Sequence, residues 1–184
     1  MSSGESDIYY AYISGNDSYP EFFVGRFSAQ NSGHVLTEVE RTINYEKTPE
    51  TGDWYSKGLM IASNEGPGDD GEDDWEHARN LRELLLGYNY SAIDELYDGN
   101  HSNGGVDASG NPSSTSLRNI LNDGRGILHY TGHGETTEFI TTGFDNSNAN
   151  SLTKAIFISL WQFSITFAAS ATLIVLALYV PAGI

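Results

Sequence analysis

The first 154 residues contain short apolar runs that alternate with longer segments in which apolar residues recur every three to four positions. Each short run is bounded by turn residues, which is typical of a buried parallel strand. The segments with the longer period are typical of amphipathic helices. The pattern predicts strands at 58–63, 92–97 and 126–131 and helices at 32–47, 74–86 and 113–122.

Residue types at the ends of two predicted helices support these boundaries. Ser32 is a suitable N-cap for the first helix, and Thr48-Pro49 ends it. Gly87 ends the second helix. We expect the inner face of the first helix to carry Val35, Leu36, Val39 and Ile43, and that of the second to carry Ala78, Leu81, Leu84 and Leu85.

Two aromatic and β-branched runs near the N-terminus predict two further strands, 8–14 and 22–28, joined by the turn-rich segment GNDSYP. Strands that alternate with helices are typical of a parallel sheet with crossover connections. The predicted fold class for residues 1–154 is therefore α/β, a mostly parallel sheet with crossover helices.

The pattern changes after Lys154, because no charged residue follows it and 155–180 is almost continuously apolar. A helix through this stretch would be about 39 Å long, enough to cross the roughly 30 Å hydrocarbon core of a bilayer. The stretch indicates either a transmembrane helix or a buried strand and helix without a visible turn. A membrane anchor is normally flanked by several basic residues on its cytoplasmic side, whereas here only Lys154 is present. We treat 155–184 as a separate apolar segment.

Composition and charge exclude several classes of protein. The chain has 184 residues, and its 39% hydrophobic content suits one folded domain with a core rather than a disordered chain. Asp and Glu outnumber Lys and Arg by 25 to 9, and the resulting net charge of −16 repels phosphate backbones, which excludes a nucleic-acid partner. Cysteine is absent, so the chain has no disulfide and no thiol nucleophile. The polar N-terminus predicts no secretion signal.

Candidate catalytic residues follow the predicted strands, because catalytic groups gather at the carboxyl ends of parallel strands. His133 stands between two glycines directly after the 126–131 strand. An imidazole in this place is suited to act as a general base or acid near neutral pH. The other histidines are expected in solvated or structural positions: His34 and His77 on helices, His101 in a polar loop and His129 within a strand.

An acidic loop follows the 58–63 strand and begins with Asn64 and Glu65. Carboxylates at this density are able to bind calcium through oxygen ligands, although their spacing does not match the EF-hand. The calcium candidates are Asp69, Asp70, Glu72 and Asp73. Alternatively, the loop is solvated and Asp73 or Asp74 caps the next helix. A single carboxylate that points into a pocket would also recognise a cationic side chain.

Four segments in order, GNDSYPEFFVGRFSAQ, ERTINYEK, IASNEGPGDDGEDDWEHARNL and ILHYTGHGE, resemble the catalytic domain of the gingipain family of cysteine peptidases. The resemblance extends from Ser6 to Thr153. It implies a caspase-like α/β fold, incomplete in this chain, and hydrolysis of peptide bonds after Arg or Lys. It also implies an extracellular or cell-surface location and protein or peptide substrates with basic residues.

The resemblance implies a role for each candidate residue. His133 matches the family's general base, and Glu65 matches the acid that orients this histidine. Asp74 matches the carboxylate of the pocket for a basic P1 side chain. Backbone N–H groups near Gly134 would stabilise the oxyanion. No cofactor is required, and calcium is the one candidate ligand.

The family's nucleophile is a cysteine at the end of the next strand, and this chain lacks it. The stretch 156–160 matches the expected strand, but Trp161 and Gln162 stand where the family has Ala-Cys. Ser164 and Thr166 are nearby hydroxyls, yet neither lies in the expected motif. A catalytic thiolate is therefore absent from the chain.

Two functions are compatible with these residues. The first is a fragment of a gingipain-like cysteine endopeptidase, inactive because its thiol is missing. The resemblance and the charge end together after Thr153, so we expect the chain from Ala155 onward to be a reading-frame product. The second is a membrane-anchored, non-catalytic module that binds calcium or basic peptides and uses 155–180 as its membrane segment. We expect the first.

Overall fold

The computed structural model describes most of the chain up to residue 153 and short parts of the apolar segment. The described residues are 7–17, 21–22, 27, 29–48, 51–68, 71–135, 137–153, 155–156, 172–175 and 179–180.

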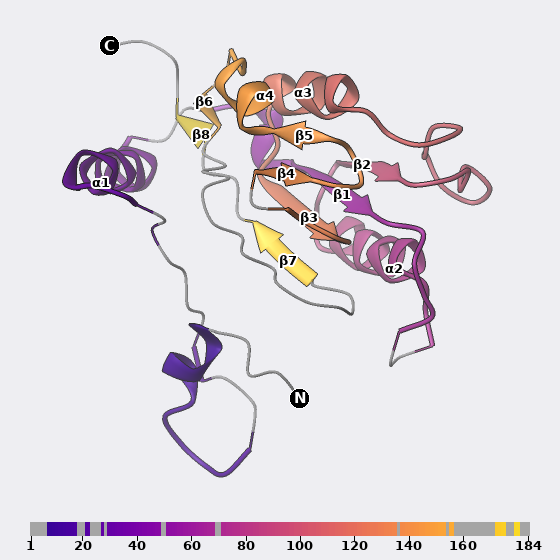
Figure 1. Ribbon diagram of the computed structural model, residues 1–184, viewed down its shortest axis with the longest axis horizontal. Coiled ribbons are helices and arrows are strands. Elements are labelled where there is room, and N and C mark those ends of the chain that lie inside the picture. The colour runs from indigo at the N-terminus through magenta and orange to yellow at the C-terminus, as the bar shows by residue number, and fades with distance from the viewer. Residues whose placement is uncertain are drawn as a thin grey trace.

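The centre of the structure is a four-stranded sheet with the order β2-β1-β3-β7 (Figure 1). Its central strand β1, Lys57–Ala62, pairs in parallel with β2, Ala92–Tyr97, and with β3, Ile127–Thr131. The edge strand β7, Thr172–Val175, pairs antiparallel with β3. The sheet is therefore α/β in type and mostly parallel, as the sequence predicts.

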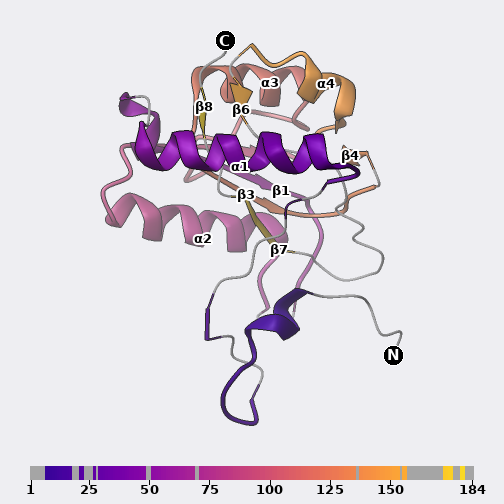
Figure 2. The same ribbon diagram turned by 90° about the vertical axis from the view of Figure 1, so that its left-hand side faces the viewer.

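Helices cover both faces of this sheet (Figures 1 and 2). Helix α2, Asp74–Gly87, lies on one face, and α3, Ser114–Asp123, lies on the other with the short α4, Asn146–Asn150. Successive residues of a strand point to opposite faces, so each strand supplies two cores. Met60 and Ala62 pack with Ala78 of α2, whereas Leu59 and Ile61 pack with Leu117 and Leu121 of α3.

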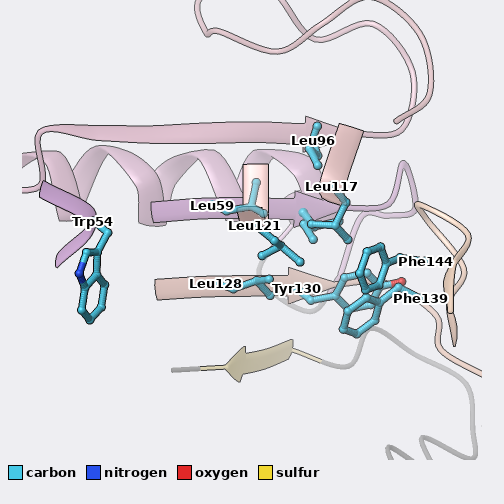
Figure 3. Close-up of a cluster of buried hydrophobic side chains, with 10 residues drawn as sticks. Trp54, Leu59, Leu96, Leu117, Leu121, Leu128, Tyr130, Phe139 and Phe144 are labelled. Carbon is cyan, nitrogen blue, oxygen red and sulfur yellow. The ribbon is translucent and has the colours of Figure 1, made fainter. Parts of the chain in front are cut away.

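The larger core lies on the α3 face and contains most of the buried aromatic rings (Figure 3). Tyr130 of β3 stacks on Phe139, with ring centroids 4.6 Å apart. Phe139 and Phe144 come from a two-stranded hairpin, β4 at Glu138–Phe139 and β5 at Phe144–Asp145. This hairpin follows the β3 strand end, and its packing holds the segment that contains His133. The hydrophobic pattern did not predict the hairpin, because two-residue strands are too short to show a period.

The predicted elements between residues 57 and 131 are confirmed within one residue at nearly every boundary. Ser113 caps α3 by accepting a hydrogen bond from the Ser116 N–H. Leu84 is the exception on the predicted inner face of α2, because it is 60% exposed while Ala78 is fully buried. Gly87 is the last helical residue, and the C-cap is Tyr88.

The N-terminal region departs from the prediction. Within 8–14, the structure has the 3₁₀ helix η1, Asp7–Ala11, followed by irregular chain, so the predicted strand is wrong. A strand needs a hydrogen-bonded neighbour, and the described residues provide none here. Most of the predicted strand 22–28 lies outside the described residues, and Phe22 and Phe27 are not in a strand.

Helix α1, Ser32–Lys47, forms as predicted, but its N-cap is Asn31 rather than Ser32. The Asn31 side chain accepts from the His34 N–H at 3.1 Å. The predicted inner face is not buried: Val35, Leu36 and Ile43 are exposed, and no residue of α1 is buried. Tyr45 connects this helix to the core through Trp54 of the 3₁₀ helix η2, Asp53–Ser56.

The apolar segment 155–184 lies largely outside the described residues. The predicted reading-frame product begins at Ala155, so this prediction also concerns mostly residues outside the described ones. Its described parts are strands, namely β7 and the pair β6, Ala155–Ile156, and β8, Tyr179–Val180. The residues of 155–180 that the structure describes are therefore in strands and not in one helix. Across the described part of the chain, no helix is both long and apolar enough to span a bilayer.

Candidate active site

The register of the parallel strands brings three strand ends together at one edge of the sheet. Ala62 of β1 lies opposite Tyr97 of β2 and opposite Thr131 of β3. The chain after each of these residues therefore enters the same region. These following segments carry Glu65 after β1 and His133 after β3, which confirms the predicted neighbouring strand ends.

Glu65 and His133 form a direct pair although 68 positions separate them in the chain. His133 Nε2 lies 2.9 Å from Glu65 Oε2, which is within hydrogen-bond distance. The side chains are 50% and 59% exposed, so the pair lies at the surface. Because Nε2 donates to the carboxylate, Nδ1 is the ring nitrogen that is left to exchange a proton with a reacting group.

The backbone at His133 is held by close packing. Gly132 has a φ of +154°, and a Cβ there would lie 2.9 Å from Thr141 Oγ1 and 3.2 Å from Ser63 Cβ. Only glycine suits this conformation and this space. The Tyr130 hydroxyl donates to the His133 carbonyl and thereby anchors the residue to the core.

Gly134 lies opposite Phe139 in an isolated antiparallel bridge. The bonds of this bridge run from Ile140 N–H to the His133 carbonyl, 3.1 Å, and from Glu135 N–H to the Glu138 carbonyl, 3.0 Å. They leave the Gly134 N–H without an acceptor in the described part of the chain. This donor is one residue from the imidazole and is available to a ligand.

Asp74 is the first residue of α2 and is only 6% exposed. Its N–H donates to the Glu65 carbonyl at 2.8 Å, so the loop between them is closed by a backbone hydrogen bond. Its carboxylate accepts a hydrogen bond from the Ser63 hydroxyl through Oδ2. The helix cap is instead Asp73, whose N–H donates to Glu76 Oε2 at 3.0 Å in a capping box.

The closed loop depends on Gly66, which has a φ of +150°. A Cβ at this position would lie 2.6 Å from the Asp73 Cα, so a larger residue would push the two ends of the loop apart. Further along, Gly68 N–H donates to the Glu72 carbonyl at 2.9 Å. These contacts place Glu65 and Asp74 side by side.

The calcium candidates are only partly covered by the structure. Glu72 Oε1 accepts from Asn80, 2.7 Å, and its Oε2 lies 3.4 Å from His77 Nδ1. Asp69 and Asp70 lie outside the described residues. Within the described residues, no group of three or more metal-ligating side chains is arranged to hold an ion. Calcium binding by this loop stays a prediction.

His101 is a residue near the site whose position the sequence did not indicate. It is partly buried rather than solvated, and its ring stacks on Trp75 at the start of α2, with centroids 4.0 Å apart. Its Nε2 lies 3.0 Å from Asn64 Oδ1, directly before Glu65. Burial raises the pKa of Asp107, whose carboxylate accepts from the His101 and Tyr97 N–H groups. The polar residues on both sides of Trp75 in the sequence give no signal for this contact.

His129 lies within β3, as expected for a strand side chain, and is 2% exposed. It faces α2, where the ring of His77 lies 6.4 Å away between centroids. Burial, and secondarily the nearby His77, lowers the pKa of His129 to about 4. His129 is therefore neutral at pH 7 and belongs to the core rather than to the site.

The predicted place of the nucleophile lies outside the described residues. The chain has no cysteine, and Trp161, Gln162, Ser164 and Thr166 are all in the undescribed stretch 157–171. Of the predicted strand 156–160 only Ile156 is described, and it belongs to β6, which pairs with β8. The strand beside β3 is instead β7, with Thr172 opposite Thr131.

Comparison with known proteins identifies relatives of this chain. Gingipain R2 and a gingipain R1 of Porphyromonas gingivalis are each 36% identical to it over 156 residues, or 82% of this chain. The chain spans 19% of the first protein and 14% of the second, a fifth or less of the curated relatives that it matches.

Solved structures and a family model agree with these relatives. The crystal structure of the Arg-specific cysteine proteinase gingipain R has a TM-score of 0.66 and 34% identity over 81% of this chain and 33% of that chain. The complex of the Porphyromonas gingivalis RgpB pro- and mature domains has a TM-score of 0.65 with the same coverage. The model of peptidase family C25 matches residues 2–168, which extends past Thr153 into the apolar segment. On this match and on the shared fold, the chain belongs to peptidase family C25 and is a relative of the gingipain cysteine peptidases.

Proposed function

We propose that this chain is part of a gingipain-like cysteine endopeptidase that cleaves peptide bonds after basic residues, and that it is inactive as it stands. The observation that carries the proposal is the 2.9 Å contact between His133 and Glu65 at the strand ends, beside the buried Asp74. A general base held by an acid, next to a carboxylate for a cationic side chain, is the arrangement that this reaction needs.

His133 is the proposed general base, acting through Nδ1. Glu65 holds Nε2 and thereby sets both the tautomer and the orientation of the ring. In a complete site, the proton of a thiol nucleophile would pass to Nδ1 and from there to the leaving amine of the cleaved bond. The Gly134 N–H is the proposed donor to the oxyanion, because it lies next to the imidazole and has no acceptor among the described residues.

Asp74 is the proposed recognition group for an Arg or Lys side chain at P1. A carboxylate binds a guanidinium group strongly when both are removed from water, and Asp74 is 6% exposed. The name of the Arg-specific relative supports a preference for arginine. The substrates would therefore be proteins or peptides with basic residues.

The missing thiol accounts for the proposed inactivity. With no cysteine in the chain, no thiolate is available to attack a peptide carbonyl. We expect the purified chain to show no cleavage of peptide substrates with Arg or Lys at P1 and no labelling by iodoacetamide. Turnover that iodoacetamide abolishes would contradict the proposal.

Ligand binding tests the recognition site without requiring turnover. We expect Nα-acetyl-arginine amide to bind more tightly than its neutral analogue Nα-acetyl-citrulline amide, measured from amide shifts in NMR titrations of the full chain. Asp74→Asn should weaken binding of the arginine ligand at least about tenfold, because it removes the buried partner charge. Glu83→Gln is the matched control, since it removes an exposed acid from the same helix. Equal affinity of the unaltered chain for the two ligands would refute the proposal.

A further inference from the structure

We propose that Ser63 is a positioning residue. Its single hydroxyl group couples the pair of His133 and Glu65 to the Asp74 carboxylate in the proposed P1 pocket. The inference rests on the proposed function, because it assigns Ser63 a task within that site. None of the roles assigned above to His133, Glu65 and Asp74 explains the hydroxyl group that bonds to both Glu65 and Asp74.

The backbone of Ser63 is held rigidly at the strand end. Its N–H donates to the Thr131 carbonyl at 2.9 Å, which continues the pairing of β1 with β3 beyond the last residue of β1. The residue is only 6% exposed. Its Cβ lies 3.2 Å from the position that a Cβ would occupy on Gly132, the residue before His133. Ser63 is therefore fixed relative to both strands that carry the site.

The hydroxyl group of Ser63 has two partners from the site itself. It donates to Oδ2 of Asp74, and it accepts from the Glu65 N–H at 3.2 Å. A serine hydroxyl has one hydrogen to donate and two lone pairs, so it can make both bonds at once. The Asp74 N–H donates in turn to the Glu65 carbonyl at 2.8 Å, which closes a ring of hydrogen bonds through the three residues.

This ring connects the residue proposed for cation recognition with the residue proposed to orient the imidazole. The bond to Oδ2 sets the rotamer of the Asp74 carboxylate and thus its direction toward a cationic side chain. The bond from the Glu65 N–H sets the backbone from which the Glu65 carboxylate reaches His133. Removal of the hydroxyl group would therefore disturb cation recognition and imidazole orientation together. A purely structural serine would affect stability without affecting either.

The test uses the full chain with Ser63→Ala and, as a matched control, Ser91→Ala, which removes an exposed hydroxyl group whose partner among the described residues is Ser56. Affinities for Nα-acetyl-arginine amide and Nα-acetyl-citrulline amide are measured by NMR titration. The tautomer of His133 is read from long-range ¹H–¹⁵N spectra, which show the ring nitrogen that carries the proton.

We expect Ser63→Ala to weaken binding of the arginine ligand about five- to tenfold, the effect of one hydrogen bond of ordinary strength, with little change for the citrulline ligand. In an Asp74→Asn background, the same substitution should change arginine affinity less than about twofold, because the bond to Oδ2 no longer orients a charge. The share of His133 that carries its proton on Nε2 should fall. Ser91→Ala should change none of these quantities.

Ser63→Thr and Ser63→Val supply a second comparison if Ser63→Ala does not fold. The two side chains have nearly the same volume, so their difference isolates the hydroxyl group. We expect the Thr variant to retain more arginine affinity than the Val variant.

If Asp74→Asn weakens arginine binding but loss of the Ser63 hydroxyl group does not, the inference is wrong and the proposed function stands. If the chain never distinguishes arginine from citrulline, the proposed function fails instead, and an unchanged His133 tautomer in the Ser63 variants would then overturn the coupling as well.

Discussion

Acidification from pH 7 to pH 5 should destabilise this chain through His129, a residue outside the proposed site. The side chain is 2% exposed and lies in β3 between β1 and β7. Its Nδ1 has no hydrogen-bond partner among the described residues. Burial lowers the pKa of His129 from 6.5 to about 4, and the nearby His77 on α2 adds to this effect.

The sign and size of the effect follow from the two pKa values. Below pH 6.5 the unfolded chain takes up a proton at His129, whereas the folded chain does not until about pH 4. The free energy of unfolding therefore falls as the pH is lowered through this window, by about 1.4 kcal/mol per pH unit. The loss is about 2 kcal/mol at pH 5 and about 3 kcal/mol at pH 4. Burial raises the pKa of Asp98 and of Asp107, which changes stability in the opposite direction at lower pH.

Urea denaturation at pH 7, 6 and 5 measures this loss. His129→Leu removes the titrating group from the core, so its free energy of unfolding should depend on pH less than that of the unaltered chain, by about 2 kcal/mol between pH 7 and 5. His34→Gln is the matched control, because it removes an exposed histidine outside the core. The reasoning is refuted if the unaltered chain and His129→Leu lose the same stability, or if the His129 ring titrates near pH 6.5 in the folded chain.

Two further predictions concern the two faces of the sheet and are measured by the same denaturation assay. Leu121→Ala should lower the free energy of unfolding by about 3 kcal/mol, because the side chain is fully buried against the sheet. Leu84→Ala on α2, where the side chain is 60% exposed, should lower it by less than about 1 kcal/mol. Equal losses would contradict the assignment of the core. Arg79→Met should cost about 3 kcal/mol, because it removes the two hydrogen bonds of 3.0 and 2.6 Å to the fully buried Glu95 carboxylate and leaves it with the longer contact to Arg82 Nε at 3.5 Å. A second substitution, Glu95→Met, should recover a large part of that loss, and no recovery would show that the pair contributes net stability.

Local pattern was sufficient for the elements that build the sheet. The strand at 92–97 and the helix at 32–47 form within the predicted boundaries, because hydrophobic period and turn residues act over a few neighbouring positions. The same local information placed His133 after one strand and Glu65 after another. The motifs around them were sufficient for the family. The roles of individual residues came from the resemblance to the gingipain family rather than from the hydrophobic pattern.

Contacts between distant residues were decided only by the tertiary structure. Register within the sheet is what brings Glu65 to 2.9 Å from His133, and a shift by one residue would separate them. The buried position of Asp74 and its bond to Ser63 depend on a loop closed by Gly66, and the stacking of His101 on Trp75 depends on a second loop. Periodicity describes which face of an element is apolar, but it does not say whether another element covers that face. For this reason the sequence by itself determined that α1 is an amphipathic helix, and only the fold decided that Val35, Leu36 and Ile43 on its apolar face are exposed.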